Sequence, residues 1–174
     1  MKQRNVSRSW AVYSKDISET EWLYLNGTNG VIDNTSNIWN DTRPTDSVFY
    51  VSSNQLVNLS GGTYVAYLFA SLAGISKVGS YTGNGSTQTI DCGFSSGARF
   101  VLIKRTDASD DWYLYDSVRG IVSGNDNLLL LNTTGAESTM FDFIDPQSSG
   151  FSLPNSGSFG PNVTGASYIF YAIA

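Results

Sequence analysis

Histidine is absent from the chain, and cysteine occurs once, as Cys92. Without histidine, the Ser-His-Asp and Cys-His arrangements of nucleophilic catalysis cannot form, and no histidine can bind a metal. A single cysteine excludes a disulfide within the chain and a cysteine-based zinc site. These absences predict a protein that has no catalytic residues, no metal site and no cofactor.

Charged residues are also scarce, at 14% of the chain, and the net charge is −5. Nucleic-acid binding needs a basic surface that displaces counterions, so we expect no nucleic-acid partner. Long apolar segments are missing too, because the longest run, residues 64–72, is too short to cross a bilayer as a helix. The first ten residues lack the apolar core of a signal peptide. We expect no membrane insertion, and synthesis in a host cytoplasm without an export signal.

The residues that are abundant favour strands. The chain has 17 glycines, many Ser, Thr and Asn residues, and an aromatic share of 13%, which suits turns and pleated sheets. Apolar runs at 100–104 and 112–115 flank a polar connection and predict a hairpin. A helix is conceivable around 134–143, where the periodicity is weak. Strand signals recur about every ten residues, so the sequence predicts an all-β sandwich.

An internal repeat is the most informative pattern in the chain. Asn58-Leu-Ser-Gly-Gly-Thr-Tyr64 resembles Asn162-Val-Thr-Gly-Ala-Ser-Tyr168, and the apolar residues that follow match as well. Further blocks pair in the same order: 10–13 with 112–115, 23–28 with 129–134, and 38–39 with 140–141. The repeat predicts two related units, a first one at 1–74 and a complete second one at 75–174. Large rings found in both units, such as Trp10 with Trp112, are expected in the core.

The first unit is predicted to be truncated at its start. Met1 aligns with Ile103, so the first unit has no equivalent of the two strands expected within 78–102. Three explanations stay open: the chain is a piece of a longer protein, a neighbouring chain supplies strands by β-augmentation, or both units share one core. The second explanation predicts a homo-oligomer.

The ordered blocks resemble a known group of proteins. Val78-Gly-Ser-Tyr-Thr-Gly-Asn-Gly-Ser86, Phe100-Val-Leu-Ile-Lys-Arg-Thr-Asp107, Trp112-Tyr-Leu-Tyr-Asp116 and the terminal Tyr168 strand are similar to repeats in tail and tail-fibre proteins of marine bacteriophages, including cyanophages. The resemblance implies a location in the virion and a jelly-roll or concanavalin-like β-sandwich, also similar to laminin-G domains. It implies other virion proteins as partners, or a host-surface glycan.

Carboxylates are the remaining candidates for chemistry. Pairs drawn from Asp107, Asp110, Asp111 and Asp116, or Asp142 with Asp145, could serve a polysaccharide depolymerase, but the favoured explanation is a solvated hairpin loop at 107–111 and a turn at Asp145. Asp107, Asp110 and Asp111 could also hold calcium, although their spacing is not that of an EF-hand. They are therefore candidate ligand-binding residues rather than catalytic ones.

Trp22 is the fourth candidate, because no tryptophan matches it in the second unit. If exposed, its ring could stack on a sugar or a partner chain; the alternative is a buried or edge-packed ring. The sequence thus favours a non-enzymatic virion protein, a tail-fibre or tail-associated adhesion segment. The alternatives are a capsid decoration or self-assembling filament protein with donor-strand contacts, and a carbohydrate-binding module or depolymerase.

Overall fold

Alternation of apolar residues builds the longest strands of the computed structural model, which describes residues 1–33, 37–155 and 157–174. In β14 (Ser167–Ile173), Tyr168, Phe170 and Ala172 are buried on one face of the sheet, and Ile169 points to the other. The described residues contain no helix. The all-β prediction is confirmed, and the segment considered for a helix contains a strand, β11 (Ser138–Phe141).

The second half of the chain is a sandwich of two antiparallel sheets. The larger sheet has the strand order β11-β10-β9-β8-β14-β6, and the smaller has the order β12-β13-β7. The bounds of β11 and β14 are given above, and those of the other strands in these two sheets are β6 (Ser76–Thr82), β7 (Gln88–Asp91), β8 (Phe100–Arg105), β9 (Trp112–Asp116), β10 (Asp126–Leu130), β12 (Asp145–Gln147) and β13 (Gly150–Leu153). The hairpin predicted from the runs at 100–104 and 112–115 is confirmed as β8 and β9.

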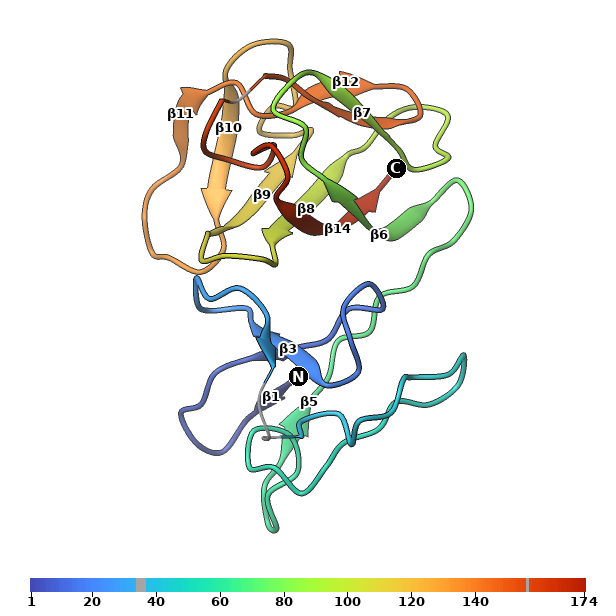
Figure 1. Ribbon diagram of the computed structural model, residues 1–174, viewed down its shortest axis with the longest axis vertical. Coiled ribbons are helices and arrows are strands. Elements are labelled where there is room, and N and C mark those ends of the chain that lie inside the picture. The colour runs from blue at the N-terminus through green and yellow to red at the C-terminus, as the bar shows by residue number, and fades with distance from the viewer. Residues whose placement is uncertain (34–36, 156) are drawn as a thin grey trace.

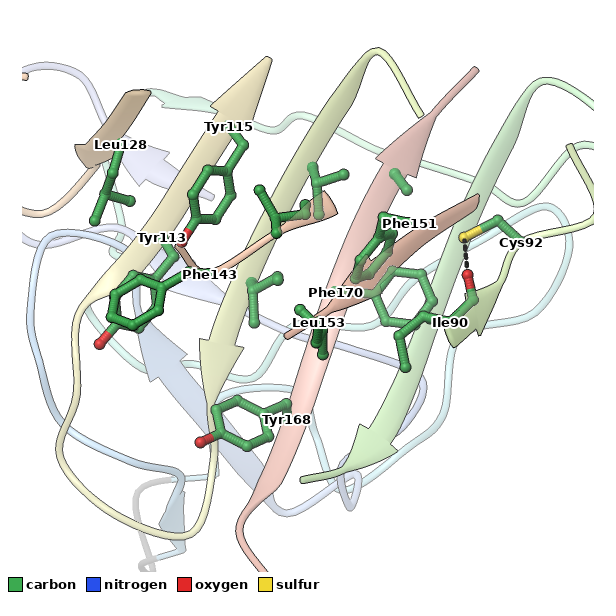
Figure 2. Packing of buried hydrophobic residues seen from close by; sticks show 14 of the residues in the cluster. Ile90, Cys92, Tyr113, Tyr115, Leu128, Phe143, Phe151, Leu153, Tyr168 and Phe170 are labelled. Atoms are coloured by element: carbon green, nitrogen blue, oxygen red, sulfur yellow. Dashed lines mark hydrogen bonds between the residues drawn. The ribbon is translucent and has the colours of Figure 1, made fainter. Parts of the chain in front are cut away.

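The core of this sandwich lies between the two sheets (Figure 2). Rings from the larger sheet meet side chains from the smaller one; Phe151 packs edge-on against Phe170 with centroids 5.4 Å apart. Tyr115 and Tyr168, expected in the core, are both buried there. Burial of each such ring contributes about 2–3 kcal/mol, so this core is the main source of stability in the chain.

The first half has shorter strands and a smaller core. Its strands pair as β2-β3-β4 and as β1-β5, with the bounds β1 (Lys2–Gln3), β2 (Ala11–Val12), β3 (Glu21–Tyr24), β4 (Ile32–Asp33) and β5 (Tyr64–Val65). The buried side chains of its core are Ala11, Trp22, Ile38, Trp39 and Val57. Figure 1 shows this half below the sandwich, next to the larger sheet.

Strand pairing in the two halves follows the paired blocks of the sequence. Four residue pairs of the first half have a counterpart in the second. The pairs in the first half are Ala11–Tyr24, Val12–Leu23, Lys2–Val65 and Gln3–Tyr64. Their counterparts in the second half, in the same order, are Tyr113–Leu130, Leu114–Leu129, Lys104–Ile169 and Arg105–Tyr168. Loop contacts also correspond. Asn26 Oδ1 accepts from Trp10 N at 2.8 Å, and Asn132 Oδ1 accepts from Trp112 N at 2.8 Å.

The two halves differ in how their last strands, β5 in the first half and β14 in the second, are paired. β14 pairs along its whole length with β8 on one side and β6 on the other. Its counterpart β5 pairs over two residues with β1 alone, and no strand partner is found among the described residues on its other side. Within the apolar run 64–72, Tyr67, Leu68 and Phe69 are exposed. They are uncovered because no described strand of the first half corresponds to β6.

Within the described ranges, no helix is long and apolar enough to cross a membrane.

Candidate functional site

The outer face of the larger sheet is a contact surface within the chain. On this face, opposite the sandwich core, Trp112 and Ile169 pack against Leu23 and Ile17 of the first half. β9 and β14 place Trp112 and Ile169 outward because every second residue of a strand faces the same way. We call this contact the seam. The repeat predicted that Trp112 and Trp10 both lie in a core. Trp112 is buried, in the seam rather than in the sandwich, whereas Trp10 is only half-buried, so the prediction was wrong for Trp10.

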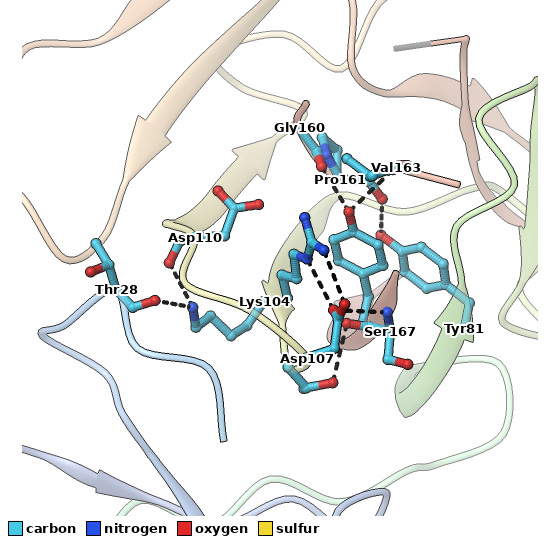
Figure 3. A network of polar contacts seen from close by, with 12 residues as sticks. Thr28, Tyr81, Lys104, Asp107, Asp110, Gly160, Pro161, Val163 and Ser167 are labelled. Atoms are coloured by element: carbon cyan, nitrogen blue, oxygen red, sulfur yellow. Dashed lines mark hydrogen bonds and ion pairs between the residues drawn. The ribbon is translucent and has the colours of Figure 1, made fainter. Parts of the chain in front are cut away.

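Lys104 is the charged residue at the centre of the seam. It is completely buried, and its Nζ donates to Thr28 O at 2.9 Å and to Asp110 O at 2.6 Å (Figure 3). Burial lowers the pKa of Lys104 to about 8, and the nearby Asp110 and Asp111 oppose this change. Because the acceptors come from both halves, the ammonium group joins them at a defined position.

Backbone and indole bonds complete the seam. Trp112 Nε1 donates to Tyr24 O at 2.8 Å, and Val31 N donates to Thr106 O at 2.8 Å. Gly30 lies so close to the second half that a Cβ on it would be 2.7 Å from Thr106 O. The first half therefore docks through a loop whose backbone carries most of the polar contacts.

A surface hollow of about 320 Å³ opens beside the β8–β9 loop. Carboxylates border one side of it, and an aromatic cluster borders the other. Phe141 and Phe143 are stacked with centroids 4.9 Å apart, and Phe159 meets both edge-on. Phe159 is 55% exposed, so its ring is available to a ligand. Aromatic faces beside hydrogen-bonding groups suit a neutral polar ligand that has apolar faces, such as a sugar.

The three candidate carboxylates have different surroundings. Asp110 Oδ1 accepts from Tyr113 OH at 2.6 Å, and Asp111 Oδ1 accepts from Asn132 Nδ2 at 2.7 Å; both residues line the hollow. Asp107 does not line it. Its two oxygens accept from Arg105 Nε and Nη2 at 2.9 Å, and this pairing lowers the pKa of the Asp107 carboxyl.

Trp22 lies far from this group in the fold. It is 3% exposed and packs in the core of the first half, edge-on to Tyr24 with centroids 4.5 Å apart. Little of its ring can reach a ligand in this conformation. The structure thus brings Asp110 and Asp111 together and leaves Trp22 and Asp107 outside the hollow.

Sequence reasoning missed Lys104, Thr28 and the aromatic cluster. A signal for Lys104 was present, because Lys2 occupies the corresponding position of the repeat and its Nζ donates to Arg8 O, the counterpart of Asp110 O. The cluster combines Phe141 at the end of β11, Phe143 just after it, and Phe159 from the turn at 158–160, which no short-range pattern connects.

The same carboxylates were the sequence candidates for a calcium site. In the described part of the chain, no group of three or more His, Cys, Asp or Glu side chains converges on a point that could hold a metal ion. The calcium alternative for the 107–111 loop therefore gains no support from the geometry.

One known protein family matches the chain over its whole length. A family model described as "Domain of unknown function (DUF7483)" matches residues 1–174. The chain belongs to this family. Membership of the DUF7483 family carries no stated activity, and neither the curated proteins nor the solved structures include a match to the chain. The arguments about function therefore rest on the residues and contacts described above.

Proposed function

We propose that this protein is a non-enzymatic structural component of a bacteriophage particle, a tail-fibre or tail-associated adhesion segment built from β-sandwich units. The residues 1–74 form the incomplete unit in this proposal, and 75–174 form the complete one. A jelly-roll or concanavalin-like origin of the sandwich is part of the same proposal.

The observation that carries the proposal is the repetition of one set of contacts in both halves. Four residue pairs from two pairs of strands recur at corresponding positions in the two halves, as do the Asn26 and Asn132 loop contacts. One half docks on the sheet of the other through a mostly apolar contact centred on Trp112. Units that repeat and stack in this way form elongated assemblies, since each unit contacts its neighbours. The resemblance of the blocks to phage tail repeats points to the particle.

The test is immunogold electron microscopy of particles purified from an infected host, with an antibody raised against this chain. Labelling at the tail supports a fibre or adhesion segment. Labelling on the head would instead favour the capsid decoration protein, and unlabelled particles would remove the virion role. Antibody depleted with the purified chain is the control for specific labelling.

The hollow beside Asp110 supports a second candidate function, binding of a host-surface glycan. The specific observation is the exposed ring of Phe159 in the same hollow as Asp110 and Asp111. Titration calorimetry with host polysaccharide is expected to show saturable binding that falls about tenfold in Phe159→Ala, because stacking on one ring contributes about 1 kcal/mol or more.

Val118→Ala is the matched control for Phe159→Ala, since Val118 is an exposed apolar residue outside the hollow. Equal binding by both variants would exclude the hollow as the site. Release of reducing sugar during the titration, abolished in Asp110→Asn, would instead indicate a depolymerase.

A further inference from the structure

The seam consists of two complementary surfaces, one on each half. The acceptor face of the second half is formed by Lys104, Trp112 and Ile169. Residues 24–31 of the first half, here called the docking loop, supply carbonyl oxygens to Lys104 Nζ and to Trp112 Nε1. Because the paired blocks place equivalent residues in both halves, each half has its own acceptor face and its own docking loop.

The acceptor face of the first half has the same chemistry, and no docking loop covers it in the described part of the chain. It consists of Lys2, Trp10 and Val65, which correspond to Lys104, Trp112 and Ile169. Lys2 Nζ donates to Arg8 O, but no described residue takes the place that Thr28 O has beside Lys104. Likewise, no described residue accepts a hydrogen bond from Trp10 Nε1.

The surroundings of Trp10 are apolar and open to solvent. Tyr67 stacks on the Trp10 ring with centroids 5.8 Å apart and is 65% exposed. Leu68 and Phe69 beside it are exposed as well, and residues 66–69 form no backbone hydrogen bonds with the rest of the described chain. Contiguous exposed apolar residues beside unpaired backbone are characteristic of an interaction site.

The docking loop of the second half, residues 130–137, is also unoccupied. Leu131 corresponds to Leu25, which packs into the seam, yet Leu131 is 42% exposed. Thr134, the counterpart of Thr28, is exposed with its neighbours. In the described part of one chain, no hydrogen bond joins this loop to Lys2 or Trp10.

We propose that the acceptor face of the first half binds the docking loop of a second copy of this chain. In this contact, Lys2 Nζ donates to Thr134 O, Trp10 Nε1 donates to Leu130 O, and Leu131 packs against the Trp10 ring. The two surfaces are different, so the contact is heterologous and joins copies head to tail into an open chain. The seam within each molecule is the template for the contact between molecules.

Two positions of the second docking loop depart from the template. Ala136 stands where the first loop has Gly30, and a Cβ there would approach a carbonyl oxygen to 2.7 Å in the seam geometry. Glu137, which accepts a hydrogen bond from Asn127 Nδ2 and pairs with Arg119, stands where Val31 packs in the seam. The second loop therefore sits slightly further out than the first, which makes the contact between copies weaker than the seam. Association that depends on concentration is the expected behaviour.

The experiment is sedimentation velocity of the purified chain over a range of concentrations. The wild-type protein is expected to form species larger than a dimer as concentration rises. Leu131→Glu blocks the docking loop, and Tyr67→Glu blocks the acceptor face; each alone is expected to sediment as a monomer. Val118→Glu makes the same change at an apolar residue that is 88% exposed and lies outside both surfaces, and it should associate as the wild type does.

Mixing the two blocked variants distinguishes a heterologous contact from any symmetric one. Leu131→Glu retains an intact acceptor face, and Tyr67→Glu retains an intact loop, so an equimolar mixture should form a dimer and stop there. Circular dichroism checks that each variant is folded, and Leu131→Ser with Tyr67→Ser serves as a milder pair.

A wild-type monomer at every concentration, a mixture that stays monomeric, or blocked variants that still associate would each overturn the proposal. It is independent of the virion role. If particles are labelled but the chain is a monomer, the virion role is supported and the contact between copies is refuted. If the chain self-associates but particles are not labelled, the contact is supported and the virion role is refuted.

Discussion

Lys104→Met tests whether a buried ammonium group joins the two halves. In the folded protein the pKa of Lys104 is lowered from 10.5 to about 8 because burial disfavours its charge. In the unfolded chain the lysine keeps its proton up to a pH of about 10.4. Between these values the unfolded state binds more protons, so the free energy of unfolding rises with pH. The shift corresponds to a gain of about 3 kcal/mol from pH 7 to pH 10.5.

Methionine at this position fills similar space, but it donates no hydrogen bond and has no ionisable group. At pH 7 the loss of the bonds to Thr28 O and Asp110 O should lower the free energy of unfolding by about 1–3 kcal/mol. The variant lacks the gain at higher pH, so the difference between wild type and variant should widen by about 3 kcal/mol toward pH 10.5.

Urea unfolding followed by tryptophan fluorescence at several pH values between 7 and 10.5 measures this difference. Lys15→Met, which removes an exposed lysine paired with Asp16, is the control and should retain the pH dependence of the wild type. If the difference in free energy of unfolding between the wild type and Lys104→Met stays constant across this pH range, the seam does not contain a buried ammonium group that titrates.

Three further predictions concern the sandwich of the second half. Tyr115→Phe should be neutral or stabilise the fold by up to about 1 kcal/mol in urea unfolding, because the buried Tyr115 hydroxyl has no hydrogen-bond partner among the residues that the structure describes; a loss above about 1 kcal/mol would contradict this. Burial raises the pKa of Asp126 to about 6. The folded state therefore binds a proton more tightly than the unfolded state, and the melting temperature should decline as pH rises from about 4 to 6. Asp126→Asn should lack this decline when melting temperatures are measured across that range. The buried Asn162 side chain accepts from Asn84 N and Gln88 Nε2 and donates to Ser86 O and Pro154 O, so Asn162→Ala should cost about 2–4 kcal/mol in the same unfolding assay. Asn58→Ala, at the exposed counterpart in the repeat, should cost less than about 0.5 kcal/mol, and similar losses for both would refute the role of burial.

Strands with strong alternation were predictable from local sequence. The hairpin of β8 and β9 was located by its two apolar runs, because alternate side chains of a half-buried strand must be apolar. The segment 134–143 was ambiguous, since its short apolar stretch fits either period, and the pairing of β11 with β10 decided it in favour of a strand.

The candidate site was less predictable. Asp110 and Asp111 line the hollow as a loop position suggested, but the opposing wall comes from residues about thirty and fifty positions further along the chain. Trp22 had no matching tryptophan and was considered for exposure, yet the strands around it form a core of their own. Burial depends on what packs against a side chain, and neighbours in space are not visible in a single sequence.

The strand-forming character of the chain and the paired blocks are visible in the sequence alone, because both depend on the order of side chains along an extended backbone. Which of the equivalent positions are buried depends on how the two halves pack. Lys104 and Trp112 are covered by the first half, whereas Lys2, Trp10 and Tyr67 remain partly or largely exposed. Similar segments acquire different environments because burial is a property of the surfaces that meet, and the second half meets a partner surface that the first half lacks.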